Sequence, residues 1–453
     1  MTTPSRERGP ARGSSAGAGA FSPAVVLLAA LPVLVAVWKQ APCLQRGWGG
    51  QLPFWRFCYS DLAVTTETSG AEAGLTAYLT GSVPLDQPPL TGAVMSLLAG
   101  PAPGEGALAT QRWVIAAWAV LSVVGLAAMA WWVATARSAT DRPLGTDPRM
   151  VVLAPVAALT VLLSPDLLGV ALATSGLWAW TRRQPLLAGA LLGAGVMART
   201  YPALLLVVVA LFAWRTGRER ELPRLVGGAL ATVAVVALPL LALSPGTLTR
   251  AWRTWIDLPA GLGSVWYLPT LAGDPWSAPV LTGVSIVGIG LALVLAGLLV
   301  LGAPVTPRLG AVALLVVAVA LVSGKSFPVQ ASLWLVPLVA LAGLRWRDHL
   351  VWALAEGVHF VTVWLHLGGA GTNRALPPSW YAAALLVRVL AVCWLAVRAW
   401  QVATERQPVV EDPAGPANAS VDTSADTSGD ASVDAPADGG SGDFGRVPVS
   451  RYS

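Results

Sequence analysis

Three acidic residues flank apolar segments of this sequence, where a carboxylate could take part in chemistry. Asp61 lies in the stretch CYSDL, in the polar interval after the first long apolar segment. Asp86 follows in LDQPPLTG, and Asp166 opens the segment SPDLLGVAL. A carboxylate beside a reacting hydroxyl can act as a general base. The same residue type also caps helices and stabilises turns, so both interpretations stay open for all three positions.

Three cations stand on the same predicted side of the chain as these acids. Arg199 lies in MARTYPALL, Lys325 in SGKSFPVQ and Arg374 in GTNRALPP. Arginine and lysine commonly bind phosphate, and arginine can hold it through two donors, so a basic pocket for the phosphate of a lipid carrier is one interpretation. The pair Trp266 and Tyr267 in GSVWYL could stack on a sugar face or belong to an interfacial aromatic belt.

The histidines His349, His359 and His366 raise the question of a metal site, because 359 and 366 share a helical face. No carboxylate accompanies them on the predicted outer side, and His349 falls at the opposite end of the same predicted helix. Packing roles are therefore favoured over metal binding. The sequence predicts no metal site and no cofactor, and it leaves a need for a divalent cation open.

The composition is that of a polytopic membrane protein. Of the 453 residues, 55% are hydrophobic and only 12% are charged, and the 21 tryptophans suit a membrane–water interface. The net charge of +5 understates the basic character of the body of the chain, because many acidic residues gather after Arg406. Basic loops of this kind mark the cytoplasmic side of a membrane protein, so nucleic-acid binding is not indicated.

Apolar segments that can cross the roughly 30 Å hydrocarbon core predict an all-α bundle of about 12 transmembrane helices. Their ranges are 23–40, 113–136, 150–163, 165–180, 185–199, 201–214, 223–243, 279–302, 308–323, 328–344, 349–367 and 380–400. With both termini in the cytoplasm, the arginine clusters fall on the cytoplasmic side. The segment 88–100 is apolar but short, and it is expected to be half-inserted or interfacial rather than spanning.

The chain is expected to form one transmembrane domain over residues 23–400. A disordered cytoplasmic segment, 1–22, precedes it, and a disordered acidic tail, 401–453, follows it. Cys43 and Cys58 share the first predicted external loop and could form a disulfide if that loop faces an oxidising exterior. The sequence leaves this pairing open.

The order of several short motifs resembles glycosyltransferase family 87. These motifs are CYSDL, AYLTG, DQPPLTG, SPDLLGVALA, LAGALLGAGVMARTYPALLL, GSVWY and SLWLVPLVAL, and the likeness runs over roughly residues 20–400. The family comprises actinobacterial polyprenol-phosphate-dependent transferases with the multi-span GT-C fold. The resemblance implies an acidic catalytic residue at Asp61, and it implies that Arg199, Tyr201 and Pro202 lie near the donor phosphate. The chain departs from the family in having SPD where NWD is expected, and DQPPLTG where relatives often have EYPxLTG.

The resemblance implies a plasma-membrane enzyme that moves a hexose, with mannose favoured, from a polyprenyl-phosphate sugar donor to an extracytoplasmic glycan or glycolipid. Asp61 would be the general base, and Asp86 and Asp166 are candidates for a second acid. The donor phosphate would meet Arg199, Tyr201, Lys325 and Arg374, and the sugar would stack on Trp266 and Tyr267. The alternative is a transporter or flippase for a lipid-linked sugar, although a transporter is expected to place its ionisable residues near the bilayer midplane.

Overall fold

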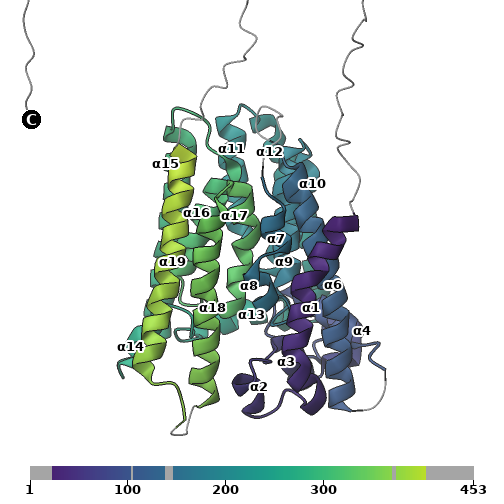
Figure 1. The fold of residues 1–453 in the computed structure, drawn as a ribbon. Helices are drawn as coiled ribbons and strands as arrows, with labels where there is room; N and C mark the ends of the chain where they lie inside the picture. The colour runs from purple at the N-terminus through teal and green to yellow at the C-terminus, as the bar shows by residue number, and fades with distance from the viewer. Residues whose placement is uncertain (1–22, 104–105, 138–145, 370–373, 405–453) are drawn as a thin grey trace, which may run out of the picture. The chain divides into compact units, whose positions relative to one another are not determined.

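The computed structural model describes residues 23–103, 106–137, 146–369 and 374–404, and over these residues the protein contains helices and no strands (Figure 1). The predicted disordered segment 1–22 and residues 405–453 of the predicted tail 401–453 lie outside the described residues. Residues 401–404 of that predicted tail are helical, because the last helix continues to Thr404. The expectation of an all-helical protein is therefore confirmed for the part of the chain that the structure describes.

Among the described residues, six helices are long and apolar enough to cross a membrane. They are α1 (Pro23–Arg46), α6 (Ala107–Thr135), α12 (Leu222–Leu243), α15 (Ala278–Gly302), α18 (Trp346–Gly368) and α19 (Pro378–Thr404). A helix of about 20 residues rises about 30 Å, which matches the hydrocarbon thickness of a bilayer. Large apolar side chains are exposed along these helices, as at Leu27, Val235 and Val287. Such a surface is that of a polytopic membrane protein, because it suits lipid rather than water.

Shorter helices fill the bundle between the long ones. They are α5 (Pro89–Ala99), α7 (Arg149–Val152), α8 (Pro155–Thr160), α9 (Asp166–Thr181), α10 (Pro185–Ala198), α11 (Pro202–Arg215), α16 (Leu309–Ser323), η3 (Val329–Trp334) and α17 (Val336–Ala342). Many begin with proline, which lacks the N–H that the first turn of a helix leaves unpaired. The predicted segment 150–163 is broken at Pro155 into α7 and α8. The 11 residues of α5 rise about 16 Å, too little to cross a bilayer alone.

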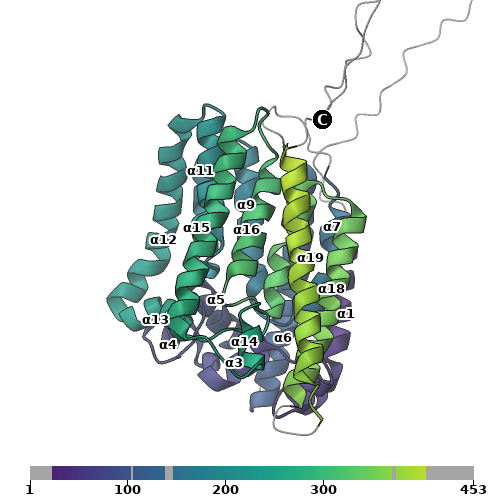
Figure 2. The same ribbon diagram turned by 90° about the vertical axis from the view of Figure 1, so that its left-hand side faces the viewer.

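The connections at one end of the bundle are themselves helical. They contain α2 (Leu52–Trp55), α3 (Asp61–Ser69), η1 (Ala71–Ala73), α4 (Gly74–Leu79), α13 (Pro245–Asp257) and α14 (Tyr267–Leu271). Figure 1 shows α2, α3, α4, α13 and α14 at the lower end of the bundle, which we call the Asp61 end, and Figure 2 shows the last four of these there as well. The junction between α11 and α12 lies at the opposite end, where α11 finishes at Arg215.

Small residues allow the central helices to pack closely. Helix α10 contacts α9 and α12 along its length. A Cβ added at Gly189 would lie 1.8 Å from the Leu225 carbonyl oxygen, and one at Gly228 would lie 2.2 Å from that of Leu186. Helix pairs in membranes gain most of their stability from such backbone approach, because lipid provides little hydrophobic drive between helices. Helix α10 is thereby held in place, and its C-terminus leads directly to Arg199.

Candidate active site

The first loop, residues 47–88, is tied to the rest of the protein around Asp61. A disulfide joins Cys43 in α1 to Cys58, so the pairing that the sequence left open is present. The Ser60 hydroxyl donates to the Leu162 carbonyl at 2.6 Å, and the Asp61 amide donates to the Leu163 carbonyl at 2.7 Å. These bonds seat the first turn of α3 on the turn that follows α8.

The carboxylate of Asp61 is half-buried and lies among polar groups from distant parts of the chain. The Gln330 amide donates to Asp61 Oδ2 at 3.2 Å. Burial raises the pKa of Asp61 to about 6, because a low-dielectric environment disfavours the charged form. Hydrogen bonding from the Tyr59 phenol opposes this shift, the charge of Asp166 adds to it, and Arg199 opposes it. A carboxyl group with a pKa near neutrality suits proton transfer.

Asp166 and Arg199 form a buried ion pair beside Asp61. Arg199 donates to Asp166 Oδ1 through Nη2 at 2.6 Å and through Nε at 2.9 Å. The second carboxylate oxygen of Asp166 accepts a bond from the Trp334 indole at 2.6 Å, and the Ser164 hydroxyl donates to the first at 2.9 Å. Arg199 also donates to the Gln87 side chain at 3.0 Å. Both charges are therefore paired inside the protein.

Tyr201 completes this group. Its ring stacks on that of Trp334 with the centroids 4.5 Å apart. Four residues that the sequence singled out thus come together at the Asp61 end, from three separate stretches of the chain: Asp61, Asp166, Arg199 and Tyr201.

Asp86 and Lys325 make other contacts. Asp86 is exposed and accepts a bond from the Thr254 hydroxyl of α13 at 3.2 Å, although its neighbour Gln87 contacts Arg199. The buried ammonium of Lys325 donates to the carbonyls of Ile256 at 2.8 Å and Leu258 at 3.0 Å, and to the Thr282 hydroxyl at 2.7 Å. All three of its donors are used, two at the C-terminus of α13 and one by Thr282 of α15. Burial lowers its pKa.

The aromatic candidates Trp266 and Tyr267 contact parts of the chain other than the ion pair. The Trp266 indole donates to the Ser323 carbonyl at 2.8 Å, and its ring stacks on Trp276 with the centroids 5.2 Å apart. Tyr267 meets the ring of Tyr381 edge-on at 6.1 Å. Both rings therefore have packing partners within the protein, which the sequence alone did not reveal. Arg374 is exposed.

The histidines lie in α18 among aromatic rings. The ring of His366 stacks on Tyr381 at 4.7 Å, and His359 Nε2 lies 3.5 Å from the Tyr381 hydroxyl. His349 lies between Trp346 and Trp352, away from the other two. In the described part of the chain, no three His, Cys, Asp or Glu side chains come together in a way that could hold a metal ion.

Three charged residues that the sequence reasoning passed over lie in the long helices: Arg388 and Glu356 are buried, and Lys39 is half-buried. Arg388 of α19 donates to Glu356 of α18 at 2.9 Å. Lys39 of α1 donates to the Leu159 carbonyl at 2.5 Å. The sequence could have identified them, because ionisable residues inside apolar segments of membrane length are energetically costly and usually have a structural or functional role.

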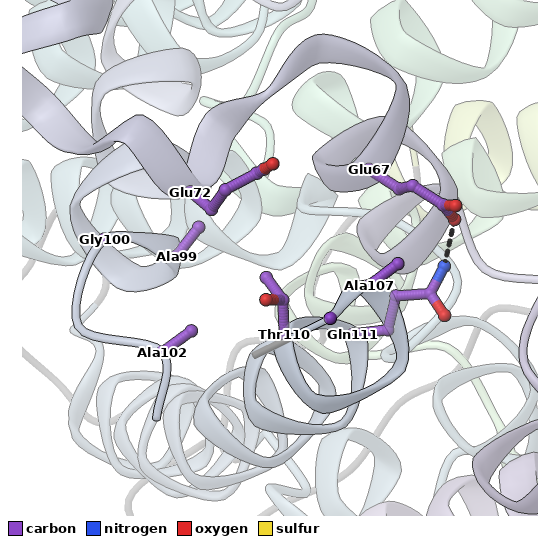
Figure 3. Close-up of a pocket in the computed structure, with 9 residues that line it drawn as sticks. Glu67, Glu72, Ala99, Gly100, Ala102, Ala107, Thr110 and Gln111 are labelled. Atoms are coloured by element: carbon purple, nitrogen blue, oxygen red, sulfur yellow. Dashed lines mark hydrogen bonds between the residues drawn. The ribbon is translucent and has the colours of Figure 1, made fainter. Parts of the chain in front are cut away.

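A pocket of about 370 Å³ opens at the Asp61 end of the bundle (Figure 3). Glu67 of α3 and Glu72 of η1 line it, together with Thr110 and Gln111 of α6. The Gln111 amide donates to Glu67 at 2.5 Å. Glu67 follows Asp61 by six residues in α3, which places the two carboxylates on different faces of the helix. The pocket and the Asp61 carboxylate are therefore separate features.

A comparison of the chain with models of known protein families finds no match, and neither does a comparison with curated proteins. The function is therefore inferred from the geometry of the residues and from the motif resemblance described above.

Proposed function

We propose that the protein is a membrane glycosyltransferase that uses a polyprenyl-phosphate sugar as its donor. The observation that carries the proposal is the half-buried carboxylate of Asp61, whose pKa is raised to about 6. Its position is set by the hydrogen bond that the Asp61 backbone N–H donates to the Leu163 carbonyl. The resemblance of the sequence motifs to glycosyltransferase family 87 supports the same activity, and it names mannose as the favoured sugar.

In the proposed reaction, the acceptor hydroxyl of a glycan or glycolipid attacks the anomeric carbon of the donor. The bond from that carbon to the acceptor oxygen forms as the bond to the phosphate oxygen breaks, and the bonding electrons leave with the polyprenyl phosphate. Asp61 takes the hydroxyl proton as a general base and later releases it to water. One carboxylate suffices because the departing phosphate is stable as an anion, whereas a glycosidase normally needs a pair.

The Asp166–Arg199 pair has a supporting role in this proposal. Arg199 is held in a hydrogen-bonded network by Asp166, Gln87 and the Ala198 carbonyl, so its charge is positioned before any substrate binds. A preorganised cation stabilises charge that develops in a transition state without a further cost of reorganisation. The departing phosphate develops such charge. Tyr201, stacked on Trp334, lines the same region.

We further propose that the Asp61 end faces the extracytoplasmic side and that the helices make the GT-C arrangement of about 12 spans. Arg215 and Arg182 lie at helix ends remote from Asp61, since α9 and α11 both begin near the Asp166–Arg199 pair and run away from it. Basic residues of this kind favour the cytoplasmic side. The disulfide between Cys43 and Cys58 agrees with an oxidising exterior around the first loop.

The proposal is tested by transfer of radiolabelled mannose from polyprenyl-phosphate mannose to endogenous glycolipid in membranes that contain the protein. The Asp61→Asn variant removes the base and keeps the shape, and we expect a loss of at least about 100-fold in rate. Glu67→Gln is the matched control, because it neutralises a carboxylate of the same helix that does not contact Asp61, and its rate should equal that of the parent.

Equal labelling with the parent and with Asp61→Asn would remove Asp61 from the chemistry. No labelling with the parent from mannose, glucose or pentose donors would contradict the transferase proposal. Movement of the lipid-linked sugar across the bilayer, without transfer, would then establish the transporter alternative.

A further inference from the structure

Lys39 is a cation placed among the apolar residues of a membrane-length helix. It lies in α1, whose neighbouring side chains Leu34, Val35 and Trp38 are exposed in the way that lipid-facing residues are. An ammonium group at membrane depth is costly, and such groups are usually paired with an acid or line a binding site. We therefore looked for the partner that balances the charge of the half-buried Lys39 side chain.

The contacts of Lys39 do not neutralise its charge. Its ammonium donates to the Leu159 carbonyl at 2.5 Å and lies 4.6 Å from the centre of the Phe360 ring. Over the residues that the structure describes, no acidic side chain forms an ion pair with it. An ammonium group has three donors, and the structure gives Lys39 one hydrogen bond. In contrast, the ammonium of Lys325 has three.

Lys39 and Asp61 attach to the same short stretch of chain. Lys39 binds the carbonyl of Leu159, the fifth residue of α8, and the Asp61 amide binds the carbonyl of Leu163. Carbonyls four residues apart lie about 6 Å apart along a helical segment. The Lys39 ammonium and the Asp61 backbone are thus both attached to α8 and the turn that follows it.

Aromatic rings occupy the space beside both groups. Phe360, under the ammonium of Lys39, meets Trp364 edge-on at 5.9 Å, and Trp364 lies 5.1 Å from the Tyr59 ring. Tyr59 is the phenol beside Asp61. Helix α8 packs against both α1 and α18. Phe360 and Trp364 are buried, so a ligand that brings an anionic head to the ammonium would place its apolar tail against the exposed side chains of α1 and not on these rings.

We propose that Lys39 binds the phosphate of the lipid-linked donor, and that the apolar tail of the donor lies in the bilayer beside the exposed side chains of α1. This inference rests on the proposed function and adds the residue that recognises the donor. The ammonium offers its unused donors to the phosphate oxygens, and it stabilises the negative charge that the phosphate gains when the bond to the sugar breaks. Lys325 is not needed for this role, because its donors are used within the protein.

The inference is tested by binding of radiolabelled undecaprenyl phosphate to the purified full-length protein in phosphatidylcholine nanodiscs. We expect Lys39→Met to weaken binding at least about ten-fold and Lys39→Arg to keep most of it, because the charge carries the interaction. Arg46→Met is the matched control, since Arg46 is an exposed cation at the end of the same helix and its loss should not change binding. Size-exclusion chromatography of each variant is the control for correct folding.

Two competitors identify what the site recognises. Unlabelled undecaprenol lacks the phosphate and should compete poorly, and phosphatidylglycerol should also compete poorly if the site is built for the polyprenyl carrier. Effective competition by undecaprenol would contradict recognition of phosphate by Lys39. Effective competition by phosphatidylglycerol would assign the site to ordinary phospholipid and overturn the donor assignment.

Mannose transfer by the same preparations separates this inference from the proposed function. Equal binding by the parent and Lys39→Met, or no binding by the parent, overturns the inference even where the parent transfers sugar. Binding that depends on Lys39, in a parent that transfers no sugar, supports the site and contradicts the transferase proposal.

Discussion

The carboxyl group of Asp61 is surrounded by groups that shift its pKa in opposite directions. Burial raises the pKa to about 6, and the Asp166 charge adds to the shift, whereas Tyr59 and Arg199 oppose it. A general base works only in its deprotonated form. We therefore expect the rate of mannose transfer to rise with pH up to about 6 and to stay level above it, with a fall of about ten-fold per pH unit on the acidic side. Initial rates between pH 4.5 and 8 measure this profile.

Asp166→Asn tests whether Asp61 is the group that titrates. The variant removes a negative charge that raises the pKa of Asp61, and it leaves the Arg199 charge without its partner. Both changes favour the ionised form of Asp61, so the midpoint of the pH–rate profile should move to lower pH, whatever happens to the maximal rate. A midpoint that does not move would show that another group sets the profile.

At the scale of helices, the buried pair of Arg388 and Glu356 joins α18 and α19 to the segment before η3. Arg388 donates to the Phe327 carbonyl at 2.6 Å, the Pro328 carbonyl at 3.0 Å and the Ser332 hydroxyl at 3.0 Å, in addition to Glu356. The Trp352 indole donates to the other oxygen of Glu356 at 3.1 Å. Every strong bond of this cation is made within the protein, so we assign it a structural role.

Glu356→Gln should destabilise the protein by about 3–5 kcal/mol, because it leaves the Arg388 charge buried and unpaired. Thermal unfolding in detergent, followed by the loss of the monodisperse peak, measures the effect. The control is Glu221→Gln, which breaks the partly exposed pair with Arg218 and should cost less than about 1 kcal/mol. Similar losses in both variants would contradict a structural role for the buried pair.

Across the whole bundle, the orientation in the membrane can be tested with single cysteines in a Cys393→Ser background. Asp274→Cys, in the exposed loop after α14, should react with a membrane-impermeant maleimide in intact cells. Gln184→Cys, at the exposed junction of α9 and α10, should react only after the cells are permeabilised, since the nearby arginines favour the cytoplasm. The reverse pattern would place Asp61 on the cytoplasmic side and contradict the extracytoplasmic reaction.

Local properties of the chain were enough to predict much of the fold. Runs of apolar residues determine which segments can form membrane-length helices, and the predicted ranges 113–136, 279–302 and 380–400 fall within or beside α6, α15 and α19. The breaks inside the predicted segments 150–163 and 328–344 were harder to predict from the sequence. They depend on how Pro155 and the residues around Pro337 are accommodated by neighbouring helices.

The sequence by itself marked Asp61, Asp166 and Arg199 as candidates, because ionisable residues next to apolar segments are unusual, and the motif resemblance added Tyr201. Only the tertiary structure decided that Asp166 is the partner of Arg199, that the donors of Lys325 are used by α13 and α15, and that Lys39 is bonded to the helix before the turn that holds Asp61. The sequence determines the chemical type of each residue. Its partner is determined by the packing of helices that are distant in sequence, and the partner decides whether a charge is already neutralised or can still bind a ligand.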